Sequence, residues 1–178
     1  MTALSKIKRF LRLYVMKQKL LFFFLFTLPS LAFAADLRGR LGIGASNQLA
    51  NEIPAISLKI QQSKTFALGG ILGFKSDQDN TLYGAGIKFY RIIFDEPQLN
   101  FYMAALFASQ NYLDETDKLK TGYQIDGTLG TEFHFSGLES IGFSFETGIS
   151  ARNADADGGS TLQTLGDQFL KAAFHFYL

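Results

Sequence analysis

The sequence predicts an all-β fold: an eight-stranded, antiparallel, up-and-down β-barrel that follows an N-terminal export signal. Eight segments carry an apolar residue at every second position, which is the period of a β-strand. The connections between them alternate between long and short. This pattern is typical of barrels that have long loops at one end and short turns at the other. The first 34 residues differ from the rest, because they combine basic residues with a short apolar run.

The N-terminal 34 residues have the organisation of a cleaved secretory signal peptide. They hold six basic residues and no acid, then an apolar run over residues 20–28 and the Ala32-Phe33-Ala34 end. A membrane anchor helix is the alternative, but it needs roughly 20 apolar residues, and Pro29 interrupts this run. Met16, followed by Lys17 and Lys19, is an alternative start of the signal, in which case residues 1–15 are a mis-called extension. The predicted mature domain is 35–178.

The first four predicted strands cover residues 37–46, 55–62, 66–75 and 83–90. In each of them large apolar residues alternate with glycine, serine or a basic residue, so one face is apolar and the other is small or polar. The second strand is the shortest. The apolar face of these strands carries Leu37, Leu41, Ile43, Ile56, Leu58, Ile60, Phe66, Leu68, Leu72, Phe74, Tyr83, Ala85, Ile87 and Phe89.

The last four predicted strands cover residues 99–108, 121–135, 141–150 and 169–178. They repeat the alternation, and the run over 121–135 is the longest. Their apolar face carries Leu99, Phe101, Met103, Phe107, Tyr123, Ile125, Leu129, Phe133, Phe135, Ile141, Phe143, Phe145, Ile149, Leu170, Phe174, Phe176 and Leu178.

The charged residues of the strands all lie on the second face, which decides the expected solvent. A soluble barrel turns its charges to water, whereas a transmembrane barrel turns its apolar face to lipid and encloses small and polar residues. The many glycines on the second face suit the crowded interior of eight strands. We therefore predict a transmembrane barrel whose lumen holds a charge network of Arg38, Arg40, Lys59, Lys88, Asp126, Glu132, Glu146 and Lys171.

The C-terminal segment resembles the strand that outer-membrane barrels present to their insertion machinery. Lys171, Ala173, Phe176 and Leu178 fill its polar, small, apolar and terminal apolar places. Residues 83–90 and 99–105 also resemble the middle hairpin of small OmpA/OmpX-type barrels. The resemblance to this family implies an eight-stranded barrel in the cell outer membrane. It implies no single activity, because the fold hosts several.

One motif suggests chemistry. His134-Phe135-Ser136 resembles the His-x-Ser of outer-membrane lipid A deacylases, in which the histidine activates the serine and an acid such as Glu146 orients it. We expect this hydrolase to be the alternative, and a non-enzymatic barrel to be the main hypothesis. The chain has no cysteine, which excludes a thiolate metal site, and no ligand spacing predicts a metal or another cofactor.

The expected function follows from the enclosed charges and the loops. Eight strands leave room for side chains only, so we predict a plugged lumen and a role in envelope integrity or surface interaction. The alternatives are a narrow channel for small solutes and a soluble barrel with an apolar ligand at its centre. Expected partners are outer-membrane lipid and lipopolysaccharide, and the insertion machinery and periplasmic chaperones during biogenesis. We expect a monomer that binds no nucleic acid, because there is no basic patch. The acidic loops are expected at 77–79, 114–117 and 155–159.

Overall fold

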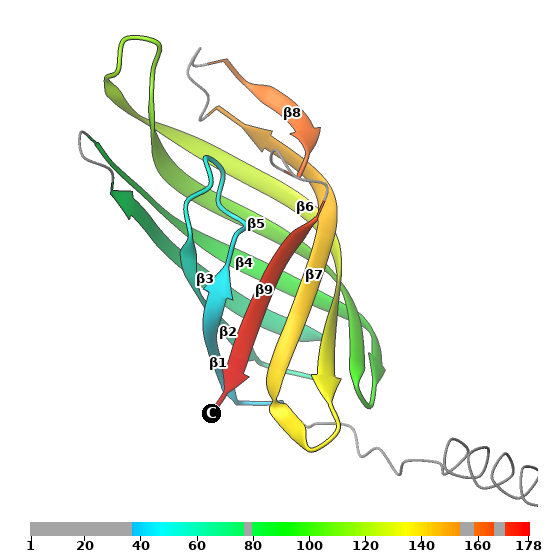
Figure 1. Cartoon of the computed structure of the whole chain (residues 1–178). Coiled ribbons are helices and arrows are strands. Elements are labelled where there is room, and N and C mark those ends of the chain that lie inside the picture. The colour runs from blue at the N-terminus through cyan, green and yellow to red at the C-terminus, as the bar shows by residue number, and fades with distance from the viewer. Residues whose placement is uncertain (1–36, 77–79, 154–158, 166–169) are drawn as a thin grey trace, which may run out of the picture. The chain divides into compact units, whose positions relative to one another are not determined.

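The computed structural model describes residues 37–76, 80–153, 159–165 and 170–178 (Figure 1). The predicted signal peptide over residues 1–34, and most of two of the acidic loops, lie outside the described residues. Within the described part of the chain, no helix has the length and apolarity needed to cross a bilayer.

The described residues form nine antiparallel strands in one sheet (Figure 1). Its order is β6-β5-β4-β3-β2-β1-β9-β7-β8, and β6 also pairs with β7, which closes eight of the strands into a barrel. The prediction of an all-β, closed, eight-stranded antiparallel barrel is therefore confirmed. The strands are β1 (Leu41–Ser46), β2 (Ala55–Gln61), β3 (Phe66–Ser76), β4 (Thr81–Glu96), β5 (Leu99–Leu113), β6 (Leu119–Phe135), β7 (Leu138–Arg152), β8 (Thr161–Thr164) and β9 (Lys171–Tyr177).

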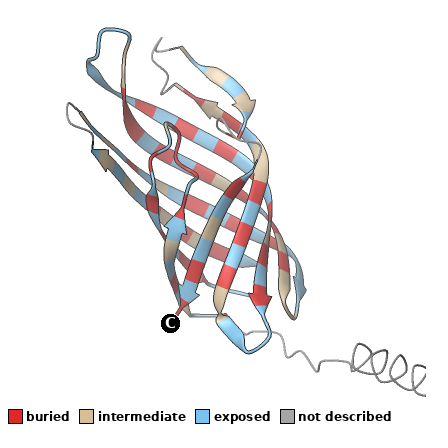
Figure 2. Ribbon diagram, viewed as in Figure 1, coloured by how far each residue is buried: buried red, intermediate tan, exposed pale blue. Residues whose placement is uncertain are grey.

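Burial alternates along most of each barrel strand, as the two-residue period requires (Figure 2). The apolar face points away from the axis: Phe143 is 40% exposed and Phe174 is 48% exposed. The charged face points inward, where Lys88 is 2% exposed and Glu146 is 5% exposed. The predicted orientation of the two faces is therefore confirmed.

The eighth barrel strand is interrupted, which the sequence pattern does not indicate. β8 pairs with the C-terminal part of β7, from Ile149 to Arg152, and β9 pairs with its N-terminal part, from Ile141 to Glu146. Leu165 follows β8 and is fully buried, and its backbone N–H donates to the carbonyl of Gly148. Two strands, β8 and β9, thus pair along β7 in place of one.

The predicted first strand begins four residues too early. The chain turns over Leu37–Arg40, where the Arg40 N–H donates to the Leu37 carbonyl and Gly39 has a φ of 75°. This left-handed conformation favours glycine and breaks the alternation. Leu37 is consequently buried and Arg38 is exposed, so the prediction that Arg38 lies in the lumen is wrong.

Candidate functional site

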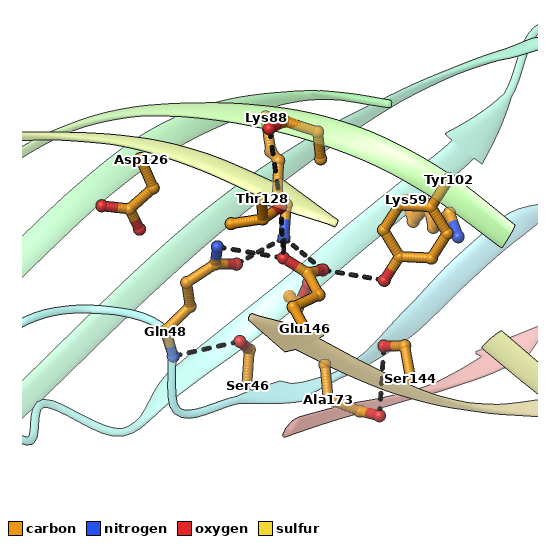
Figure 3. Close-up of polar contacts among 12 residues, drawn as sticks. Ser46, Gln48, Lys59, Lys88, Tyr102, Asp126, Thr128, Ser144, Glu146 and Ala173 are labelled. Carbon is orange, nitrogen blue, oxygen red and sulfur yellow. Dashed lines mark hydrogen bonds and ion pairs between the residues drawn. The ribbon is translucent and has the colours of Figure 1, made fainter. Parts of the chain in front are cut away.

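The centre of the lumen holds an ion pair between β4 and β7 (Figure 3). Lys88 Nζ lies 2.5 and 2.6 Å from the two carboxylate oxygens of Glu146. The Tyr102 hydroxyl donates to Glu146 Oε1 at 2.8 Å, and the Thr128 hydroxyl donates to Oε2 at 2.9 Å. Glu146 thus accepts hydrogen bonds from three neighbouring strands, which uses nearly all of its lone pairs.

A second ion pair lies between β2 and β6. Lys59 Nζ is 2.6 Å from Glu132 Oε2, and the Tyr177 hydroxyl donates to Glu132 Oε1 at 2.6 Å. Two histidines flank this carboxylate: His134 Nε2 lies 3.9 Å from Oε2, and His175 Nδ1 lies 3.8 Å from Oε1. Lys59 and Glu132 are both almost fully buried. The charges of Lys59 and Glu132 therefore compensate each other, as a low-dielectric interior requires.

Two tyrosine rings join the ion pairs into one cluster. Lys59 Nζ lies 4.7 Å from the centroid of the Tyr90 ring, and Lys88 Nζ lies 4.9 Å from the same centroid. Tyr90 and Tyr102 pack edge to face with their centroids 5.4 Å apart. The negative faces of these rings stabilise the ammonium groups. We call this set of residues the lumen cluster: Lys59, Lys88, Tyr90, Tyr102, Glu132, Glu146 and Tyr177.

The loop between β1 and β2 enters the lumen and contacts the lumen cluster. Gln48 donates from Nε2 to Glu146 Oε2 at 3.2 Å and accepts from Lys88 at its Oε1. Leu49 and Ile53 of the same loop are fully buried. The loop is tied to β6, because the Ala50 N–H donates to Gln124 Oε1 at 2.8 Å. We call residues 47–54 the plug loop.

The plug loop packs against Gly73 of β3, where the barrel wall has no side chain. A Cβ atom added at Gly73 would lie 2.7 Å from the Pro54 carbonyl oxygen and 2.9 Å from both Ile53 Cγ2 and Leu49 Cδ1. Glycine at this position of β3 therefore makes room for the loop. This arrangement was not predicted, although apolar Leu49 and Ile53 in a loop otherwise rich in polar residues are a detectable sign of it.

We expect a Leu49→Cys thiol to be protected from a maleimide in the folded barrel, because Leu49 is fully buried. Protection of at least about tenfold corresponds to about 1.4 kcal/mol of local opening free energy. Adding Gly73→Leu should displace the plug loop and restore rapid labelling, measured by mass spectrometry. Because the chain has no cysteine, the signal comes from this thiol alone.

The matched control for this labelling is Gly70→Leu on the same strand. An added Cβ at Gly70 would meet only the Gly86 carbonyl oxygen, at 4.0 Å. This variant should leave the Leu49→Cys thiol protected. Equal labelling in the Gly73→Leu and Gly70→Leu backgrounds would contradict the packing of the plug loop against Gly73.

The remaining predicted lumen residues have different surroundings. Asp126 is buried and accepts from Gln124 Nε2 at 2.8 Å, while its Oδ1 has no hydrogen-bond partner among the described residues. Lys171 is buried and pairs in register with Glu146 across β9 and β7. Arg40 lies at the barrel rim, where its guanidinium donates to the Tyr177 carbonyl at 2.5 Å and to Ser140 Oγ at 3.0 Å. Arg40 is therefore outside the lumen cluster.

The structure does not bring the proposed hydrolase residues together. His134 is buried and its Nδ1 lies 3.2 Å from the Glu139 carbonyl, whereas Ser136 is exposed in the turn that follows β6. No hydrogen bond joins these two residues in the described part of the chain. Glu146 is bonded to Lys88 instead. Among the described residues, no group of three or more acidic or histidine side chains is placed to hold a metal ion.

At the end of the barrel that carries the β5–β6 loop, Asp114 organises the turn. Its Oδ1 accepts from the backbone N–H of Thr116 at 2.8 Å and of Lys118 at 3.0 Å, and Lys120 Nζ lies 2.9 Å from Oδ2. The hydrogen bond from Lys120, followed by that from the Lys118 N–H, holds the pKa of Asp114 well below its usual value. The turn thus depends on an ionised carboxylate.

We expect the Asp114 carboxyl to titrate below about 3.9, the usual value for Asp. Because the folded pKa is lowered, its contribution to the turn is complete above that value and is lost as the pH falls toward the lowered pKa. The carboxyl carbon shift in NMR measures the midpoint. A midpoint for Asp114 at or above about 3.9 would be inconsistent with the turn described.

The lumen is thus filled by the lumen cluster and the plug loop, both held by hydrogen bonds that span the barrel. The alternation of residues indicated the inward charges, but the partner of each charge depends on strand register, which the sequence alone does not set. No family model, curated protein or solved structure matches the chain.

Proposed function

We propose that residues 35–178 form an integral outer-membrane protein that is exported by a cleaved signal peptide and acts without catalysis. Its role would be envelope integrity or surface interaction. The observation that carries this proposal is the orientation of the strands: large apolar side chains cover the outside of the barrel, and buried ion pairs occupy its inside. Lipid is the solvent that favours this arrangement.

The outward residues support lipid rather than water. Leu72, Phe74 and Ile87 are each more than half exposed, and similar residues lie on all the barrel strands. Such a continuous apolar surface is far larger than the patches that soluble monomers expose. A soluble barrel with an apolar ligand would instead need an apolar centre, where this barrel has the lumen cluster. The barrel also closes on itself, which satisfies the backbone groups that a bilayer would leave unpaired.

A closed lumen favours a structural or surface role over conduction. The Lys88–Glu146 and Lys59–Glu132 pairs cross the interior between different strands, and the plug loop lies against the first of them. Removing one member of either pair from this crowded interior would leave an uncompensated charge. The narrow-channel alternative requires a path that these contacts occupy.

The proposed partners follow from the proposed location. Outer-membrane lipid and lipopolysaccharide would contact the apolar outer face. The insertion machinery would read the C-terminal strand, on which Phe176 and Leu178 are exposed and Lys171 is buried. Periplasmic chaperones would accompany the unfolded chain. We propose a monomer, because each of the eight barrel strands in the described residues pairs with two neighbouring strands.

Cell fractionation with a heat-shift gel tests the location. We expect the protein in the outer-membrane fraction, with an unheated band that migrates faster than the boiled one because the closed barrel stays compact in detergent. Detergent-free solubility of the mature chain would contradict the proposal. Planar-bilayer recordings test the closed lumen: we expect no resolved steps, and regular steps would instead support the narrow channel.

A further inference from the structure

The outer wall of the barrel contains a groove at the seam where β1 meets β9. It has a volume of about 730 Å³. Its floor is formed by Ala45 of β1 and Ala172 of β9. One side is bounded by Ile56 and Leu72, and the other by Phe145 and Phe174. Small side chains thus lie between two rows of large ones.

Strand register explains why these residues form a continuous trough. Ala45 pairs with Ile56 on one side and with Phe174 on the other. Ile56 pairs in turn with Leu72 of β3. One step further along the seam, Ala172 pairs with Phe145 of β7. The trough therefore runs along the seam, across which the strands lie side by side (Figure 1).

The groove is apolar along its length and polar at one end. Ser46 and Asn47 line that end, where β1 stops and the plug loop turns into the lumen. The Asn47 side chain accepts a hydrogen bond from the Ala172 N–H at 2.8 Å, and this bond joins the end of β1 to β9. A ligand that matches this site has a long apolar part and a polar end.

We propose that the groove binds one acyl chain of a membrane lipid, with the polar part of the lipid at the Ser46–Asn47 end. This inference rests on the proposed function, because it requires the barrel wall to face lipid. Pockets for small apolar ligands have volumes of roughly 300–1,000 Å³, which includes this groove. Where lipid surrounds both states, preference arises from closer packing, and two rows of large side chains around a small floor provide it.

The absence of tryptophan from the chain permits a direct test with single reporters. Leu72→Trp places an indole beside the groove, and Phe107→Trp places one at an outward position of β5, two strands away from β3 in the sheet order and outside the groove. Each variant is folded into phospholipid vesicles in which a minority of the lipids carry brominated acyl chains. We expect about twofold stronger quenching at position 72, the factor given by a preference of about 0.4 kcal/mol.

Filling the groove supplies the control. Ala172→Leu in the Leu72→Trp protein should lower its quenching to the level of Phe107→Trp. Ala105→Leu, at an outward alanine of β5 away from the groove, should leave the quenching unchanged. Equal quenching at positions 72 and 107 would overturn the acyl-chain site. Loss of quenching at position 72 together with a dimer would also overturn it, because a second copy would then occupy the groove.

The same samples separate this inference from the proposed function. A heat-shift gel and flotation with the vesicles report whether each variant is inserted. Failure of the otherwise unaltered barrel to insert would overturn the membrane location and the acyl-chain site together. Insertion with equal quenching would overturn the acyl-chain site alone.

Discussion

A single methyl group at Gly44 is expected to prevent closure of the barrel. Gly44 of β1 pairs with His175 of β9, at the middle of the seam. A Cβ atom there would overlap the Phe174 carbonyl oxygen and would lie 2.9 Å from His175 Cα. Both are backbone atoms, so no side-chain rotation relieves the overlap, and the strands must separate. We expect Gly44→Ala to lower the free energy of unfolding by about 4 kcal/mol or more.

The measurement for Gly44→Ala is refolding into detergent, followed by the heat-shift gel and urea unfolding. The variant should lack most of the compact band. Gly70→Ala is the matched control, because an added Cβ at Gly70 meets only a carbonyl oxygen at 4.0 Å. If Gly44→Ala folds as well as Gly70→Ala, the close approach of β1 and β9 is not as described.

Replacing Glu146 by alanine should be the most destabilising change inside the lumen. The substitution leaves the Lys88 ammonium buried without its carboxylate and removes the acceptor of the Tyr102, Thr128 and Gln48 hydrogen bonds. Breaking one side of a buried ion pair costs about 3–5 kcal/mol. Urea unfolding of the refolded barrel, followed by circular dichroism, measures the loss.

Two further variants show whether the charge or the hydrogen bonds cause this loss. Thr128→Val removes one hydrogen bond and keeps the ion pair, so it should cost about 1 kcal/mol. The double variant Lys88→Met with Glu146→Leu removes both charges and should recover most of the stability, since apolar replacement of a buried pair is often close to neutral. A double variant as unstable as Glu146→Ala would exclude the buried charge as the cause.

The strands and their faces were predictable because alternation is a local property of the sequence. Outward Phe143 and inward Glu146 follow from counting along one segment, and the long β6 follows from an uninterrupted run of alternating residues. The turn at Gly39 was not predictable in this way, because the alternation of Leu37 and Arg38 continues into residues that do not extend β1.

The contents of the lumen depend on contacts between distant segments. The register of four strands around the barrel determines the ion pairs, which join Lys88 to Glu146 and Lys59 to Glu132. The burial of Leu49 depends on the space at Gly73, and neither residue alone indicates the other. His134 and Ser136 are two residues apart and would share a face of a continuous strand, but β6 ends at Phe135 and Ser136 lies in the turn that follows. Nearness along the chain therefore does not assemble a catalytic pair.

The first and last strands pair over a short stretch, and we expect the barrel to be least stable there. β1 pairs with β9 only from Gly42 to Ser46, whereas β5 and β6 pair from Leu99 to Leu113. Opening the short junction costs few backbone hydrogen bonds, so fluctuations should part the first and last strands long before the rest unravels. Among the strand residues, the amide protons of Gly42–Ser46 would then exchange with solvent soonest. The strands from β4 to β6 would stay paired during this opening, and β1 and β9 would pair again beside them.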